Sequence, residues 1–354
     1  MNGHLRCKKS FRRFVIKKIL LSYGTRPEII KLSPVIKELD KRGLSFKTVF
    51  TGQHHELYDD VKDLVPEPDY HLAIMQENQS LTNIIAGISS RFSEILKEES
   101  PELLMVQGDT STVAISALIA FYEKIPVGHV EAGLRTYDLT SPFPEEGNRQ
   151  IVSRLAKYNW APTKLAAEQL KEEKIKNIIV TGNTVVDACK NFNYPISYNN
   201  KVLITLHRRE NFGKKMEKIF KEIESLAIKH PEIEFIFPMH PNPNVQDLKS
   251  HLKHVNVINP LNYSEMMKLL SNVKFVISDS GGIQEECASF KKKILVCRNK
   301  TERPEGLNAG FARLVDTDVI HNFSWANDSP KWSGDNPYGN GDSSKKIVDS
   351  IINE

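Results

Sequence analysis

Residues 273–286 read Val-Lys-Phe-Val-Ile-Ser-Asp-Ser-Gly-Gly-Ile-Gln-Glu-Glu, which is an apolar run, a glycine turn and the start of a helix. Where a helix begins directly after a strand, its free backbone N–H groups and the positive end of its dipole form an anion site. Glu286 lies about one turn into this helix, where a carboxylate can accept hydrogen bonds from two ribose hydroxyls. The segment therefore predicts a nucleotide or nucleotide-sugar site. The alternative is a serine N-cap beside a glycine turn, with no ligand.

The composition is that of a protein with a large core. The 354 residues are about right for two domains, and 40% of them are hydrophobic and 26% charged. The formal net charge of +4 is mild, so we expect no nucleic-acid partner. No apolar run approaches the ~20 residues that a membrane span needs, so we expect no membrane contact either.

The four cysteines, Cys7, Cys189, Cys287 and Cys297, show neither CxxC spacing nor a disulfide framework. This pattern is typical of a reducing compartment, and we expect a cytoplasmic location. Residues 1–17 are basic and contain no acid, and we interpret them as an extension that precedes the first domain. A transit peptide is the alternative, but the stretch is not serine-rich and leads directly into a strand.

Short apolar runs alternate with helix-like runs in two blocks, and this order predicts parallel, doubly wound sheets. The first block has apolar runs at residues 19–23, 46–51, 103–106, 126–130 and 178–180. The second block has them at residues 202–205, 234–237, 255–258, 273–277 and 294–296. Residues 191–200 are polar and contain a proline, and they separate the two blocks.

We therefore predict an α/β protein with two Rossmann-like domains and a ligand cleft between them, at the carboxyl ends of the strands. The predicted parts are an extension, an N-terminal domain with the catalytic carboxylates, a C-terminal nucleotide-binding domain and a final helix, at residues 1–17, 18–192, 200–340 and 341–354. Motifs that directly follow strands are the first candidates for function.

The first such motif is Gly24-Thr25-Arg26-Pro27-Glu28. Arg26 can point into the cleft as a bidentate phosphate donor, and Lys31 lies on the same helix face about one turn later. A surface ion pair is the alternative for Arg26. Asp109, in Gln107-Gly108-Asp109-Thr110, also follows a strand and is either a helix N-cap or a catalytic acid.

Two further carboxylates lie in the first block. Glu131 closes a buried strand, where an unpaired carboxylate would be costly. It is either paired with Arg135 or Arg149, or held at the cleft as an acid or base. Glu145 stands at a helix start, where an acid also suits the helix dipole. Together with Asp109, these acids predict a cluster with perturbed pKa values.

The second block carries cations after its strands. His207-Arg208-Arg209 follows the first strand and forms a local anion site, and His240 has a similar position after the next strand. Arg303 lies in Thr301-Glu302-Arg303-Pro304-Glu305, which repeats the Arg-Pro-Glu turn beyond another strand. The histidines lack metal-ligand spacing, so we expect no metal. No GxGxxG follows the first strand, which disfavours a dinucleotide redox enzyme.

In their order along the chain, these motifs closely resemble those of the non-hydrolysing UDP-N-acetylglucosamine 2-epimerases. The matching segments are GTRPE (24–28), GDT (108–110), HVEAGLRT (129–136), SPFPEE (141–146), TGNTVVDA (181–188), HRREN (207–211), DSGGIQEE (279–286), TERPE (301–305) and NPYG (336–339). The resemblance implies the glycosyltransferase-B architecture, a homodimer, and interconversion of UDP-GlcNAc and UDP-ManNAc without a cofactor. UDP would leave C1 while a base removes the C2 proton, and it would add back to the resulting 2-acetamidoglucal.

The resemblance also implies roles for particular residues. The catalytic residues would be Asp109, Glu131, Glu145 and His207. The substrate-binding residues would be Arg26, Lys31, Arg135, Met266, Ser280, Gly281, Gly282, Glu286 and Arg303. Some members of the family bind a second UDP-GlcNAc as an activator, and Gln53 and His240 would fit that site. Glu56, however, stands where such members often carry Gln.

Other functions would also use a nucleotide-sugar site. A retaining glycosyltransferase of the same architecture would need the nucleotide site but not the clustered acids. A hydrolysing relative would release free ManNAc and UDP, and a non-catalytic UDP-sugar sensor would bind its ligand without reaction. The sugar is also open, because a 3-acetamido or uronic acid variant would use the same nucleotide contacts.

Overall fold

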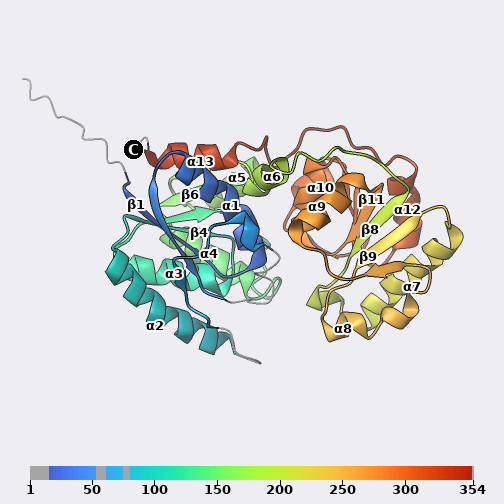
Figure 1. Cartoon of the computed structure of the whole chain (residues 1–354), viewed down its shortest axis with the longest axis horizontal. Coiled ribbons are helices and arrows are strands. Elements are labelled where there is room, and N and C mark those ends of the chain that lie inside the picture. Colours follow the sequence, from blue (N-terminus) through green and yellow to red (C-terminus); the bar gives the residue numbers. More distant parts are fainter. Residues whose placement is uncertain (1–15, 53–60, 75–79, 353–354) are drawn as a thin grey trace, which may run out of the picture.

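The computed structural model describes residues 16–52, 61–74 and 80–352, and divides them between two parallel β-sheets covered by helices (Figure 1). This arrangement confirms the predicted α/β class. Gln53 and Glu56 lie outside the described residues, so the activator site stays a prediction. Within the described ranges, no helix has both the length and the apolar character needed to span a membrane.

The first sheet has seven parallel strands in the order β3-β2-β1-β4-β5-β6-β7. Its strands are β1 Lys18–Tyr23, β2 Ser45–Phe50, β3 Tyr70–His71, β4 Leu103–Gln107, β5 Val127–Val130, β6 Tyr158–Ala161 and β7 Ile178–Val180. Its helices are α1 Arg26–Lys41, α2 Leu81–Glu99, α3 Ser111–Tyr122, α4 Glu145–Leu155, α5 Lys164–Glu172 and α6 Thr184–Lys190. The strand order reverses between β1 and β4, and such a switch point opens a crevice at the carboxyl ends.

The second sheet has six parallel strands in the order β10-β9-β8-β11-β12-β13, with its switch point between β8 and β11. Its strands are β8 Lys201–Thr205, β9 Glu234–Pro238, β10 Asn256–Ile258, β11 Phe275–Ser278, β12 Ile294–Val296 and β13 Ala312–Leu314. Its helices are α7 Lys214–Lys229, α8 Pro243–Gln246, α9 Tyr263–Asn272, α10 Gly281–Ser289, α11 Pro304–Asn308 and α12 Val319–Asn327.

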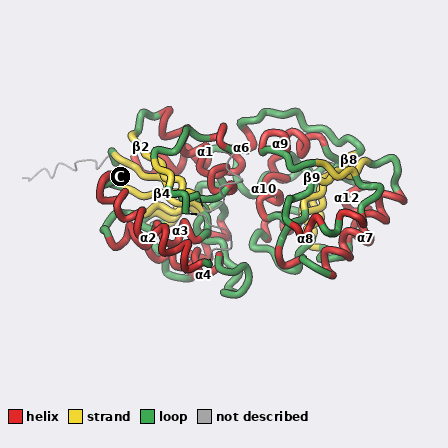
Figure 2. The backbone as a smooth tube through the Cα atoms, turned by 60° about the horizontal axis from the view of Figure 1, so that its bottom comes forward, coloured by secondary structure: helices red, strands yellow, loops and turns green. Residues whose placement is uncertain are grey.

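The last helix, α13 Ser343–Ile352, returns to the first sheet and packs against α1 and α6 (Figure 1). Trp160 Nε1 donates a hydrogen bond to Ser350 Oγ at 2.9 Å and so anchors this helix to β6. The chain therefore passes between the two halves at residues 191–200 and again before α13. Helices α6 and α10 pack together where the halves meet (Figure 2).

The predicted strands all correspond to strands of the structure, but the sequence pattern did not indicate β3, β6 or β13. Strand β6 reads Tyr-Asn-Trp-Ala, and the polar Asn159 interrupts its apolar character although the whole strand is buried. Asn159 Nδ2 lies 3.4 Å from the main-chain oxygen of Lys176 and 3.5 Å from that of Ala156. These partners serve the amide nitrogen alone, because Oδ1 is buried without a hydrogen-bond partner among the described residues.

Gly133 lies in the turn after β5 with φ +96°, and an added Cβ would lie 2.3 Å from the main-chain oxygen of Ala166. Backbone conformation and space therefore both require glycine at this position. We predict that Gly133→Ala lowers the free energy of unfolding by roughly 2–4 kcal/mol, as measured by urea denaturation.

Gly147 provides the matched control, because it lies inside α4 and an added Cβ would meet only open space. Alanine favours a helix over glycine by up to about 1 kcal/mol, so Gly147→Ala should be at least as stable as the unchanged protein. Equal stability of the two variants would contradict this explanation of the turn.

Candidate active site

A cleft of about 980 Å³ lies between the two halves, against the carboxyl ends of both sheets. Among the described residues that the sequence assigned to the site, all but Arg135 line this cleft. They are Arg26, Lys31, Asp109, Glu131, Glu145, His207, His240, Met266, Ser280, Gly281, Gly282, Glu286 and Arg303. The topology therefore brings together side chains that are up to 277 positions apart, because parallel strands end at one edge of each sheet.

Glu131 follows β5 and is held by three side chains. Lys31 Nζ lies 2.5 Å from its Oε1, Asn183 Nδ2 donates to the same oxygen at 3.1 Å, and Gln107 donates to Oε2. The alternative of a pair with Arg135 or Arg149 is therefore wrong. Glu131 has φ +67°, a left-handed conformation that is unfavourable for a residue with a side chain. Such strain is concentrated at functional sites.

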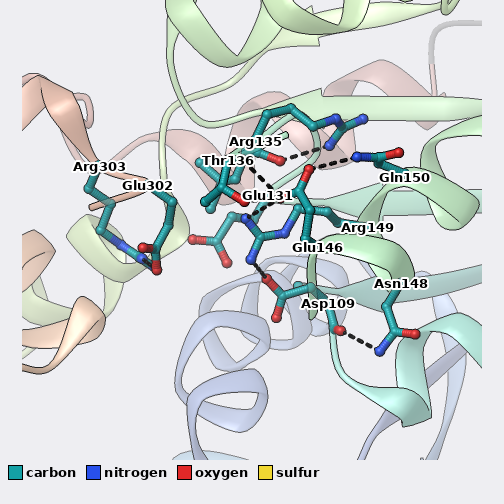
Figure 3. A network of polar contacts seen from close by, with 12 residues as sticks. Asp109, Glu131, Arg135, Thr136, Glu146, Asn148, Arg149, Gln150, Glu302 and Arg303 are labelled. Carbon is teal, nitrogen blue, oxygen red and sulfur yellow. Dashed lines mark hydrogen bonds and ion pairs between the residues drawn. The ribbon is translucent and has the colours of Figure 1, made fainter. Parts of the chain in front are cut away.

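Asp109 follows β4 and faces Arg149 from helix α4 (Figure 3). Arg149 Nη2 donates to Asp109 Oδ2 at 2.5 Å, and Asn148 Nδ2 donates to the main-chain oxygen of Asp109 at 2.9 Å. Thr110, and not Asp109, caps helix α3, because its Oγ1 accepts from Val113 N at 3.4 Å. The carboxylate of Asp109 is therefore not used as a helix cap.

The two adjacent glutamates at the start of α4 have different environments. Glu145 lines the cleft, and burial raises its pKa, with a further contribution from the charge of Asp109. Glu146 is buried away from solvent and accepts from Thr136 N at 2.9 Å, so it holds the loop after β5 (Figure 3). Only Glu145 of this pair is in a position to meet a ligand in the cleft.

Glu28 is a cleft residue to which the sequence analysis gave no role. It is buried in the first turn of α1, where it accepts from Gly24 N at 2.6 Å and from Thr110 Oγ1 at 2.6 Å. Burial raises the pKa of this carboxyl to about 7. An acid in the first turn of a helix is common on solvated surfaces, so the sequence gave no signal of its burial.

The second half contributes two stacked histidines. The rings of His207 and His240 lie 5.3 Å apart, and burial lowers the pKa of each. The loop that carries His207 is held by Asp279, which follows β11 and accepts from His207 N at 3.2 Å and Arg208 N at 3.0 Å. Both imidazoles are therefore favoured in their neutral form and can donate or accept a hydrogen bond.

Helix α10 begins at the same edge with Gly281 and Gly282, after the N-cap residue Ser280. An added Cβ at Gly281 would lie 2.6 Å from Arg303 Nη1, so glycine lets this guanidinium approach the helix terminus. The first N–H groups of a helix have no partner within it, and together with the dipole they favour an anion. Arg303 adds positive charge beside them.

The part of the cleft around Glu286 has a partly apolar wall. Glu286 lies further along α10, and burial raises its pKa to about 7, while a hydrogen bond with Tyr263 opposes that shift. Met266 from helix α9 lines the cleft beside Tyr263. A carboxylate next to a partly apolar wall is suited to a ribose and a flat base.

Arg135 lies elsewhere. Its Nε donates to Glu173 Oε1 at 2.7 Å, its Nη1 donates to Leu134 O at 2.8 Å, and its side chain is fully buried. This position outside the cleft lining does not support a substrate contact. Arg135 and Glu131 belong to the same motif, but only Glu131 lines the cleft. Their closeness in sequence could not show which of the two side chains faces a ligand.

Two Rossmann-like halves, with a helix terminus for phosphate on one and carboxylates on the other, define a nucleotide-sugar enzyme of the glycosyltransferase-B type. The family follows from comparison with known proteins. A model of the UDP-N-acetylglucosamine 2-epimerase family matches residues 37–352, and the chain belongs to this family.

Individual relatives agree over most of the chain. A UDP-N-acetylglucosamine 2-epimerase of Campylobacter jejuni is 44% identical over 330 residues, which cover 85% of this chain and 86% of the relative. One of Escherichia coli K12 is 42% identical over 327 residues, which cover 85% of this chain and 87% of the relative.

Solved structures agree as well. The UDP-GlcNAc 2-epimerase of Neisseria meningitidis, bound to UDP-GlcNAc, matches with a TM-score of 0.88 and 40% identity over 95% of this chain and 100% of that one. MurG of Acinetobacter baumannii matches with a TM-score of 0.58 over 95% of this chain and 99% of that one, but at 13% identity it shares the fold alone. The predicted family and glycosyltransferase-B architecture are thus confirmed.

The raised pKa of Glu28 predicts a pH dependence of stability. Its value of about 7 in the folded protein lies above the ordinary 4.5, so folding favours the protonated form. The contribution of Glu28 is therefore complete below about pH 4.5 and is lost as the pH rises through 7. Glu28→Gln removes this loss, so its stability relative to the unchanged protein should increase by roughly 2–4 kcal/mol between pH 4.5 and pH 8.

The measurement is urea denaturation at several pH values, with Glu168→Gln on the exposed face of α5 as the control. The control should differ from the unchanged protein by the same amount at every pH. If the difference in free energy of unfolding between Glu28→Gln and the unchanged protein is also constant with pH, the pKa of Glu28 does not change on folding.

Proposed function

We propose that the chain is a non-hydrolysing UDP-GlcNAc 2-epimerase, which interconverts UDP-GlcNAc and UDP-ManNAc and so supplies ManNAc units for surface polysaccharide. The observation that carries this proposal is the meeting of Asp109, Glu131 and Glu145 with the N-terminus of α10 in one cleft. The Neisseria meningitidis relative, whose structure contains UDP-GlcNAc, supports the choice of substrate.

The chemistry explains why both groups of residues are required. The C2 proton is not next to a carbonyl group, so its direct removal at neutral pH is very unfavourable. If the C1–O bond to UDP breaks while a base takes the C2 proton, the products are UDP and a 2-acetamidoglucal. Protonation of C2 from the other face and return of UDP to C1 then give the epimer. Atoms and charge balance, and no cofactor is consumed.

Departure of UDP requires stabilisation of the charge that grows on the diphosphate. In this proposal the terminus of α10, with Ser280, Gly281 and Gly282, receives the phosphates, and Arg26 and Arg303 add positive charge. His207 lines the same space and, in its neutral form, donates a hydrogen bond to a diphosphate oxygen. Glu286 would hold the ribose, and the wall at Met266 would meet the uracil.

The proton transfers fall to the carboxylates across the cleft. Glu145 is assigned as the general acid, because it lines the cleft near Asp109 and burial raises its pKa. Asp109 and Glu131 are fixed by Arg149 and Lys31 and would act on C2 from their set positions. The pH–rate profile of Glu145→Gln should lack one apparent pKa that the unchanged enzyme shows. If both profiles show the same apparent pKa values, the assignment of Glu145 is contradicted.

Proton NMR of UDP-GlcNAc with the protein in heavy water tests the function. We expect UDP-ManNAc to form without an acceptor and deuterium to enter at C2. Asp109→Asn and Glu131→Gln should each lower this exchange by roughly 100- to 10,000-fold, because each removes a group that exchanges a proton with the substrate. Glu168→Gln, on the exposed face of α5, should exchange at the normal rate.

The same experiment separates the alternatives. A glycosyltransferase would turn over only with an acceptor, a hydrolysing relative would accumulate free ManNAc and UDP, and a sensor would bind without exchange. Normal exchange in both carboxylate variants would remove Asp109 and Glu131 from the reaction. An epimerase of a 3-acetamido or uronic acid sugar would also bind UDP-GlcNAc without exchange, but unlike a sensor it would exchange deuterium at C2 of the corresponding UDP-sugar.

The proposal includes a homodimer in the cytoplasm. Buried thiols at Cys189, Cys287 and Cys297 suit a reducing compartment, and cell fractionation tests that location. Apolar side chains are exposed on and before α4, with Phe143 68% and Ile151 50% accessible, and a second copy would cover them. Light scattering should give twice the 40.3 kDa of one chain, and Ile151→Glu should reduce it to a single chain. A monomer before substitution would contradict the dimer.

A further inference from the structure

Glu285 on helix α10 is a buried carboxylate to which neither the family motifs nor the proposed reaction assigns a role. It neighbours Glu286 in sequence, but it is not part of the cleft lining, and its side chain is only 1% exposed. Its Oε1 accepts from Arg303 Nε at 2.6 Å, and its Oε2 lies 2.8 Å from Lys31 Nζ. Glu285 therefore contacts two cations of the cleft wall without reaching the space for substrate.

The contact with Lys31 joins the two halves of the molecule. Lys31 belongs to α1 of the first half, and Glu285 to α10 of the second. The same Lys31 nitrogen lies 2.5 Å from Oε1 of Glu131. A continuous series of charges thus runs from Glu131 through Lys31 and Glu285 to Arg303, which also donates to Glu302. Figure 3 shows Glu302 and Arg303 facing Glu131 across the cleft.

The burial of this series makes it sensitive to the distance between the halves. Lys31 has a side chain that is 6% exposed, and its pKa is raised because Glu131 and Glu285 outweigh the effect of burial. A buried ion pair is favourable only where its geometry is good and each charge keeps its partners. If the halves move apart, Lys31 loses its contact with Glu285 and keeps its contact with Glu131.

We propose that Glu285 is a positioning residue that couples the nucleotide half to the reacting carboxylate Glu131 through Lys31. Glu285 takes up one side of the Lys31 ammonium and so fixes the distance between Lys31 and Glu131. While UDP-sugar holds the two halves together, this contact keeps Glu131 in its working position. This inference rests on the proposed epimerase function.

The test uses Glu285→Gln, which keeps the size of the side chain and removes its charge. Because a displacement of about 1 Å in a reacting group can cost roughly 100-fold in rate, kcat should fall by roughly 10- to 100-fold. Because Glu285 also pairs with Arg303, which is proposed to bind the diphosphate, the dissociation constant of UDP is measured beside kcat, and the loss in kcat should exceed the change in the dissociation constant. A kcat within twofold of the unchanged enzyme would overturn the proposal.

A double substitution separates positioning from simple stabilisation of the interface. If Glu285 acts through Lys31, then adding Glu285→Gln to Lys31→Gln should lower kcat by no more than about twofold further. Independent losses that multiply in the double variant would overturn the proposal. Glu305→Gln is the matched control, because Glu305 also joins the halves, accepting from Thr163 Oγ1 at 2.5 Å, but does not contact Lys31. Its kcat should be unchanged.

Glu285→Asp keeps the charge but shortens the side chain by one methylene, and its kcat should lie between those of the unchanged enzyme and Glu285→Gln. It also provides the test if Glu285→Gln does not fold.

X-ray scattering gives a readout that needs no turnover. With UDP, Glu285→Gln should have a larger radius of gyration than the unchanged protein, and Glu305→Gln should not. Equal radii for all would count against the coupling. If the proposed function itself is wrong, the protein without any substitution will exchange no deuterium at C2 of UDP-GlcNAc, which is a different result.

Discussion

A single buried cation, Lys31, stands between carboxylates from the two halves of the molecule, 2.5 Å from Glu131 and 2.8 Å from Glu285. Lys31, Asn183 and Gln107 hold the Glu131 carboxylate, and none of these three side chains belongs to the motif that contains Glu131. The left-handed backbone at Glu131 aims the carboxylate across the edge of the sheet toward Lys31. The arrangement of the acid side of the cleft therefore depends on how the two halves meet.

The rest of the cleft follows the same principle of local charge balance. Asp109 is engaged by Arg149, and Arg303 by Glu285 and Glu302. Arg303 shares its charge with these two carboxylates, and helix α10 has no acidic residue in its first turn, so its N-terminus adds positive potential beside Arg303. In the proposed function the diphosphate binds at this helix terminus, and the acids line the opposite wall, where the sugar would lie.

Much of this could be predicted from the sequence, because it depends on local patterns. The order of strands and helices, the glycine turn before α10 and the acids after β4 and β5 are each written in a few consecutive residues. The family resemblance added the roles of residues that the patterns alone left open. The alternation of apolar runs and helix-like runs did not predict β6, because the polar Asn159 interrupts the apolar run of this buried strand.

Long-range pairings could not be predicted in this way. Lys31 and Glu131 are 100 positions apart, and no local rule distinguishes this pair from Glu131 with nearby Arg135. Glu28 has the sequence environment of a solvated first-turn acid, yet it is buried beneath the loop of Thr110. Such contacts depend on the docking of elements, and that docking is set by the whole fold.

The proposed function requires that positive groups at α10 hold the diphosphate while carboxylates face the sugar. A crystal structure with UDP-GlcNAc bound tests this most directly. We expect the diphosphate against the backbone of Gly281 and Gly282, and a carboxylate oxygen of Asp109, Glu131 or Glu145 within about 3 Å of the proton on C2. A diphosphate bound elsewhere, or carboxylates turned away from the sugar ring, would contradict the account.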